Sequence, residues 1–245
     1  MFCADNYIVD KKFFAQVKGF FDVNKMMVGL YTRHYALVKH DNSLNRYFSL
    51  IGGNDPVSFY LGKNDRLSYQ YLDRPLFFDY LIFQNNVPSL GDNGCFYWRD
   101  KILKADLDHY YPMDCAVDLI NKGHNRFIRL NFLAIWHRTT DGNLLTFLKR
   151  RYRYARDLYC DRDDRRWKMV STTQDYWRLA YFIGCTLTII PLLLFSIQGF
   201  SKVKDWAWFW HPIACWGFLL TYGYLACRNL LKYRSLSQLF SVQRA

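Results

Sequence analysis

Several carboxylate and histidine side chains in this 245-residue chain are of the types that hold metal ions or move protons. Asp5 closes the apolar run at residues 1–4, as an acidic residue at the tip of a buried strand would, and its carboxylate suits a hard divalent cation. His137 follows an apolar stretch at 127–136 and is a second candidate ligand or a hydrogen-bonded structural histidine. Taken alone, Asp5 and Asn6 could equally start a turn or cap a helix.

Two further carboxylates, Asp114 and Asp118, are four residues apart and share one face of a predicted helix over 114–122. One of them could act as a general base. The alternatives are a solvated helix face or a favourable interaction with the helix dipole. The stretch Gly-Asp-Asn-Gly at 91–94 is a turn under every interpretation.

The stretch 144–160 interleaves apolar side chains with five basic ones: Lys149, Arg150, Arg151, Arg153 and Arg156. This composition is typical of a helix that lies on anionic lipid headgroups. The same arginines could stabilise negative charge on a diphosphate. Because a helix has two faces, the two roles are compatible.

The elements that must position these residues alternate in type. Apolar spacing predicts a helix over 13–21 and strands over 26–31 and 127–136, and Gly123 caps the helix over 114–122. Residues 47–62 are expected to be rich in loops, with a turn at 52–56. Strands that alternate with helices indicate an α/β mixed sheet.

Two runs without a charged residue, 179–200 and 206–227, dominate the C-terminal third. Each is about 22 residues long, enough to cross a hydrocarbon core of roughly 30 Å as a helix. A short segment with Lys202 and Lys204 joins them, so we expect a two-helix transmembrane hairpin rather than a buried core hairpin.

Basic residues set the expected orientation. They cluster before the first run and after the second. This distribution predicts a multi-pass protein of the cell membrane whose N-terminal domain and C-terminus are cytoplasmic. The net charge of +12 is explained by this clustering, so no nucleic-acid partner is expected. The seven cysteines are scattered without metal-binding spacing, which favours packed thiols.

Four motifs occur in a suggestive order. They are Cys-Ala-Asp-Asn at 3–6, Gly-Asp-Asn-Gly at 91–94 followed by a strand and Arg99, an acidic helix ending in glycine at 114–123, and Arg-x-x-Arg-Tyr at 150–154. Over roughly residues 1–160 this order resembles the second half of a family-2 glycosyltransferase. The resemblance implies a partial GT-A-type, Rossmann-like mixed sheet with helices, followed by the membrane hairpin.

The resemblance also implies a metal site. Asp5 matches the acid that holds Mg²⁺ or Mn²⁺ and the donor's diphosphate in that family, and His137 would be a second ligand. Cys3 stands where the first acid of the family's Asp-x-Asp motif is expected, so Asp5 is the one acid of that motif that is matched.

The remaining roles concern substrates and catalysis. Asp114, or Asp118 in a shifted alignment, would be the catalytic base. The residues that match the family's substrate-binding motifs are Gly91, Asn93, Gly94, Arg150, Arg153 and Tyr154.

In that family, nucleotide-binding βαβ units precede the Asp-x-Asp strand, and we expect this N-terminal half to be missing here. The predicted divisions are residues 1–143, a C-terminal part of a glycosyltransferase domain; 144–178, a basic interfacial segment; 179–227, the hairpin; and 228–245, a cytoplasmic tail.

The expected function is transfer of a sugar from a nucleotide-sugar donor to a lipid-linked or envelope-glycan acceptor beside membrane lipids, by an enzyme that is truncated. The alternative is a catalytically inactive remnant or a membrane-anchored interaction subunit, which Cys3 and the missing half favour.

Overall fold

The computed structural model describes residues 6–8, 10–71, 78–83, 86–90, 93–106, 111–160 and 165–242, with the backbone alone at 6, 78–80, 158–160 and 230–242. It has a mixed sheet built around one long strand, β5 (Arg126–His137). The parallel strand β2 (Gly29–Tyr35) lies along one side of β5, and the short β4 (Phe96–Tyr97) pairs antiparallel beyond it. On the other side, β3 (Phe78–Ile82) pairs with the first half of β5 and β1 (Asn6–Ile8) with its end, both antiparallel.

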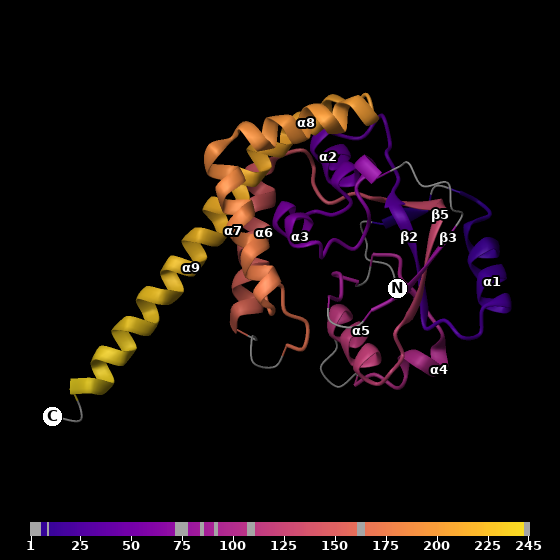
Figure 1. The fold of residues 1–245 in the computed structure, drawn as a ribbon, viewed down its shortest axis with the longest axis horizontal. Helices are drawn as coiled ribbons and strands as arrows, with labels where there is room; N and C mark the ends of the chain where they lie inside the picture. The colour runs from indigo at the N-terminus through magenta and orange to yellow at the C-terminus, as the bar shows by residue number, and fades with distance from the viewer. Residues whose placement is uncertain are drawn as a thin grey trace.

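Helices cover both faces of this sheet (Figure 1). The helix α1 (Phe13–Val23) buries Phe13 and Val17 against Leu30 and Ile128. On the opposite face, α5 (Pro112–Asn121) packs in a core with Tyr31 of β2. The short α4 (Arg99–Ile102) follows β4. The predicted mixed α/β sheet is thus confirmed, with α1 and β5 close to their predicted bounds.

One expectation about the N-terminal domain is wrong. Residues 47–62 are not mainly loop, because they hold most of α2 (Ser43–Ile51) and all of α3 (Pro56–Leu61), which a tight turn joins. Residues 6–8 form β1, a three-residue strand that pairs only with β5 among the described strands. The predicted strand that ends at Asp5 lies outside the described residues.

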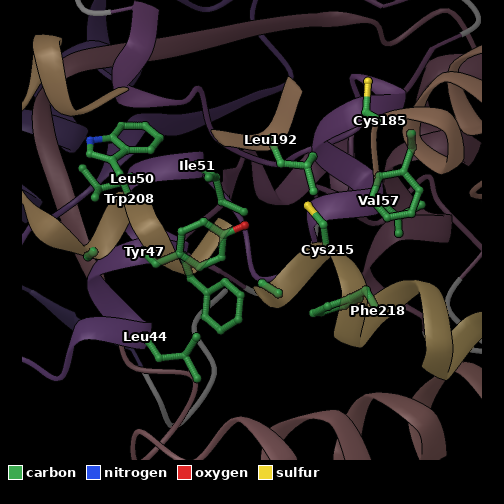
Figure 2. Close-up of a cluster of buried hydrophobic side chains, with 14 of the residues drawn as sticks. Leu44, Tyr47, Leu50, Ile51, Val57, Cys185, Leu192, Trp208, Cys215 and Phe218 are labelled. Carbon is green, nitrogen blue, oxygen red and sulfur yellow. The ribbon is translucent and has the colours of Figure 1, made fainter. Parts of the chain in front are cut away.

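A third core joins the N-terminal domain to the C-terminal helices (Figure 2). It packs α2 and α3 against α6 (Leu144–Cys160), α7 (Thr173–Thr188), α8 (Ile190–Lys202) and α9 (Trp210–Val242). The 3-10 turns η1 (Tyr69–Tyr71) and η2 (Trp206–Phe209) complete the described elements. Figure 2 shows Tyr47 and Ile51 of α2 among Leu192, Trp208 and Cys215 from the C-terminal part.

The C-terminal helices differ from the predicted hairpin. Residues 179–200 are divided at Ile189 between α7 and α8, which are bent by 94°. Pro191 explains the break, because proline lacks an N–H and its ring clashes with the preceding turn of a helix. No single described helix is both long enough and apolar enough to cross a membrane. Among the described helices, only α7 and α8 taken together have the required length and apolar composition.

The cysteines that the structure describes are free thiols. Cys95, Cys115, Cys185 and Cys215 are buried and Cys227 is exposed. This confirms the expectation of packed thiols for the four buried ones.

Candidate functional site

A cavity of about 1000 Å³ lies between the N-terminal domain and helices α6, α7 and α9. The last residues of β2 and β5, Tyr35 and His137, reach it from the sheet. The segments around α3 and α6 contribute the charged side chains of Asp65 and Arg151. Asn93, the asparagine of the Gly-Asp-Asn-Gly stretch, lines the same cavity.

Asp65 and Asp55 are buried carboxyls of this cavity, and Asp65 has an exposed fraction of 4%. Its Oδ2 accepts hydrogen bonds from the hydroxyl of Tyr35 and, at 3.2 Å, from Nδ2 of Asn93. The guanidinium of Arg66 lies 3.9 Å from the same oxygen.

Burial raises the pKa of Asp65, and the opposing effects of Arg66 and of the hydrogen bonds from Tyr35 and Asn93 do not cancel it. The carboxyl therefore takes up a proton more readily than an ordinary aspartate. A raised pKa is the property that a general base in a neutral solution requires.

His137 ends β5 and stacks on Tyr35, with ring centroids 5.0 Å apart and an interplanar angle of 23°. Its register partner in β1 is Asn6, the residue that follows Asp5 in the sequence. Asp5 and Gly91 lie outside the described residues, so their predicted roles stay predictions. Among the residues that the structure describes, no three His, Cys, Asp or Glu side chains are grouped to hold a metal ion.

Of the basic helix α6, the structure brings Arg151 and Tyr154 to the cavity. Arg151 donates from Nη2 to Oδ2 of Asp55 at 2.7 Å, and its guanidinium lies 5.1 Å from the centre of the Tyr154 ring. Arg150 instead donates to the carbonyl of Thr139 and does not line the cavity. Arg153 is exposed and does not line it either.

Asp114 lies one layer behind the cavity wall, in a buried ion pair with Arg165. Nε of Arg165 donates to Oδ2 at 2.8 Å, and the backbone N–H of Trp167 donates to Oδ1 at 2.8 Å. Both oxygens of Asp114 are therefore occupied, whereas Arg165 and Trp167 line the cavity. Nη2 of Arg165 is buried and has no hydrogen-bond partner among the described residues, and the guanidinium lies 4.0 Å from the centre of the Tyr111 ring.

Asp118 faces away from the cavity. It accepts hydrogen bonds from Lys122 and from the backbone N–H of Asp106, and it pairs with Arg166. Burial acts to raise its pKa, but the hydrogen bonds and neighbouring cations outweigh burial and lower it. Whether Asp114 or Asp118 acts as a base stays a prediction.

The loop that carries Asp65 is tied to α7 by a neighbouring ion pair. Nζ of Lys63 lies 2.8 Å from Oδ2 of Asp175, and these side chains are 3% and 2% exposed. Lys63 also donates to the carbonyls of Lys168 and Met169. Gly94, at the end of the Gly-Asp-Asn-Gly stretch, is buried with a positive φ of 69° and does not line the cavity.

Sequence reasoning missed Asp65, Tyr35 and Arg165. Asp65 stands in a polar segment whose composition indicates only a loop, and no spacing links it to Tyr35, 30 residues earlier. A buried Asp-Arg neighbour pair at 65–66 was the one available signal, and it is not specific.

The sequence matches no protein-family model, and no curated protein matches it at a significant level.

Proposed function

We propose that this chain is a membrane-associated glycosyltransferase of the family-2 type, which transfers a sugar from a nucleotide-sugar donor to a lipid-linked or glycan acceptor. The observation that carries the proposal is the convergence of Asn93, His137 and Tyr154 on one cavity. The resemblance assigns these three residues to one site, although the sequence separates them widely.

In this proposal, Asp65 accepts the proton of the acceptor hydroxyl, since it is the buried cavity carboxyl whose pKa is raised. The hydrogen bonds from Tyr35 and Asn93 fix the orientation of the carboxyl. Arg165 and Lys168 line the same cavity, and they are suited to the negative charge of a departing diphosphate.

The proposal retains a divalent cation, Mg²⁺ or Mn²⁺, with Asp5 and His137 as its ligands. Such an ion, when bound, would supply positive charge that stabilises a departing diphosphate. Of these two residues the structure describes His137 alone, so the roles of Asp65 and Arg165 are derived without the ion.

The membrane part of the proposal places the sheet domain and the C-terminal tail on the cytoplasmic side, with residues 179–227 as the membrane segment. The basic side chains of α6 and of the tail support this orientation. Crossing by two helices, 179–200 and 206–227, remains the sequence-based form of this proposal.

The test is incorporation of radiolabelled sugar into lipid and glycan fractions, by membranes that contain the full chain and a panel of nucleotide-sugar donors. We expect Asp65→Asn to reduce transfer by about 10²–10⁴-fold, the usual contribution of a general base. The matched control is Asp100→Asn, because Asp100 is exposed on α4 and outside the cavity. Equal transfer by the wild-type chain and Asp65→Asn would refute the role of Asp65.

The second candidate is an inactive remnant or a membrane-anchored interaction subunit. The observation in its favour is that both oxygens of Asp114, the expected base, are taken up by Arg165 and Trp167. Absence of incorporation from every donor, by a chain shown to be folded in the membrane, would support this candidate over the enzyme.

A further inference from the structure

The segment between the two predicted membrane runs lies against the sheet domain. Asp205 forms an ion pair with Arg46 of α2, with Nε and Oδ2 3.0 Å apart and side chains only 12% and 20% exposed. Nε1 of Trp210 donates to Oγ of Ser43 at 2.9 Å, also in α2. A hairpin that crossed the bilayer would place this segment about 30 Å away, on the opposite side.

The helix α2 is in turn fixed to the sheet domain. Asn45 of α2 accepts hydrogen bonds from the backbone N–H groups of Thr139 and Thr140, both at 3.0 Å, just after β5. Its Nδ2 donates to the carbonyl of Thr140 at 2.8 Å. The position of Asp205 relative to the sheet is therefore set by buried polar contacts.

The dimensions of α7 agree with a shallow insertion. Its apolar part, residues 179–188, is about 15 Å long at 1.5 Å per residue, half of a hydrocarbon core of roughly 30 Å. At Ile189, where φ is 63°, the chain turns by 94° into α8. A helix that enters one leaflet and then bends by this angle is directed away from the opposite leaflet, so the chain can return to the side from which it entered.

The outward face of α8 is apolar. Ile190, Leu193, Leu194 and Ile197 follow helical spacing and are 67%, 44%, 54% and 55% exposed. The inward face is occupied by small or fully buried residues, among them Gly199, where a Cβ would come within 2.4 Å of the Trp208 ring. Figure 1 shows α8 lying across α2 at the top of the molecule.

The apolar face of α8 is bordered by residues of the types found where a protein meets lipid headgroups. Lys202 and Lys204 follow its C-terminal end, and Trp206 is 73% exposed beside them. Lysine and tryptophan at the edge of an apolar surface are typical of the level of lipid headgroups. Exposed apolar residues of α7, such as Leu187 at 58%, continue the surface.

From these contacts we infer that α7 and α8 form a re-entrant wedge, which enters one leaflet of a lipid bilayer and returns to the side of the sheet domain. The occupant of the exposed face is lipid hydrocarbon. The inference rests on the membrane part of the proposed function, and it replaces a crossing at residues 179–200 by an insertion of half that depth.

The first test compares two single substitutions, Lys204→Cys and Lys18→Cys, in the full chain reconstituted into sealed vesicles. Lys18 is exposed on α1 of the sheet domain. An impermeant maleimide is added before and after permeabilisation, and mass spectrometry of the labelled peptides separates these sites from the native cysteines. The comparison is made in preparations where the fraction of Lys18→Cys labelled before permeabilisation differs from one half. We then expect the same fraction at both sites, whereas sites on opposite sides would give two unequal fractions that add to one and overturn the inference.

The second test measures flotation with vesicles of mixed neutral and anionic phospholipid. The double variant Leu193→Asp/Ile197→Asp should bind at least about tenfold more weakly, because exposed apolar side chains lose their burial in hydrocarbon. The control is Val23→Asp, at a residue of α1 that is 81% exposed. Unchanged flotation of the double variant would overturn the inference, and if its self-association in detergent also fell, the occupant would be a second copy of the chain.

The outcomes separate the inference from the proposed function. A wild-type chain that does not float would refute the membrane part of the proposed function. A wild-type chain that floats but labels from opposite sides at residues 18 and 204 would refute the wedge alone.

Discussion

Replacing Asp114 by asparagine distinguishes a structural carboxylate from one that acts on substrate. The substitution keeps the shape of the side chain and removes the negative charge that faces Arg165 in a pair with exposed fractions of 3% and 5%. An arginine left in a buried position without its counterion costs about 3–5 kcal/mol of stability. The NH₂ group of the new amide must also face either the N–H of Trp167 or Nε of Arg165. Because both of these groups are hydrogen-bond donors, one of the two hydrogen bonds to residue 114 is lost.

The assay is hydrogen exchange of the backbone amides of α5, which reports the free energy of local opening. We expect Asp114→Asn to lower that free energy by about 3 kcal/mol. The double variant Asp114→Asn/Arg165→Met should lose about 2 kcal/mol less than the sum of the two single variants, since it leaves no unpaired charge. The control is Asp118→Asn, which breaks a partly exposed pair and should cost no more than about 1 kcal/mol.

Two results would refute this reasoning. The first is an opening free energy of α5 in Asp114→Asn within about 0.5 kcal/mol of the wild-type value, combined with loss of sugar transfer, which is the behaviour of a catalytic base. The second is strict additivity of the two single substitutions, which would mean that Asp114 and Arg165 do not stabilise each other.

Burial lowers the pKa of His34 to about 4, so the unfolded chain binds more protons below pH 6.5 and the free energy of unfolding should fall by about 3 kcal/mol between pH 6.5 and 4. His34→Gln should flatten this dependence in urea titrations at several pH values, and an unchanged slope would contradict the assignment. Gly199→Val should lower the free energy of unfolding by about 1–3 kcal/mol, because the new side chain clashes with Trp208. Gly184→Val is the control and should not lower it, since a Cβ at residue 184 meets no atom within 4 Å. Thermal unfolding in detergent compares the two variants. Ile189→Gly should stabilise the bend by about 1 kcal/mol in the same assay, because glycine adopts a positive φ without strain; a lower unfolding temperature would count against strain there.

Elements with a long and regular pattern could be predicted from the sequence. The strand at 126–137 and the helix at 13–23 are rich in apolar residues over most of their length. The bounds of α6 are as predicted because its basic and apolar residues alternate at helical spacing. These patterns are local, so the elements can be predicted without knowledge of the tertiary contacts.

The expectation of loop at 47–62 failed because capping residues were interpreted as loop residues. Asn42 and Asp55 are the N-caps of α2 and α3, and Gly52 and Gly62 end these helices with φ of 79° and 70°. Glycine, asparagine and aspartate mark helix ends as often as they mark turns. Two short helices joined by one turn therefore have the composition of a loop.

The candidate site was predicted only in part, for a different reason. Asn93 and Tyr154 were singled out by motifs and do line the cavity, but Arg151 is the α6 arginine that reaches it, rather than Arg150 or Arg153. The side on which α6 faces the cavity depends on its packing against α9, which the sequence of α6 does not specify. The partners of Asp65 come from β2 and from the segment around Asn93, so its burial is a property of the assembled fold.

The ion pair of Lys63 with Asp175 has a mechanical consequence. Lys63 is two residues before Asp65, and Asp175 stands in the first turn of α7, the helix that we place in the leaflet. Lateral pressure that tilts α7 would therefore pull on the loop of Asp65 through a short and stiff connection. Lipid composition, by setting that pressure, would then tune the acidity of the carboxyl and, under the proposed function, the rate of sugar transfer.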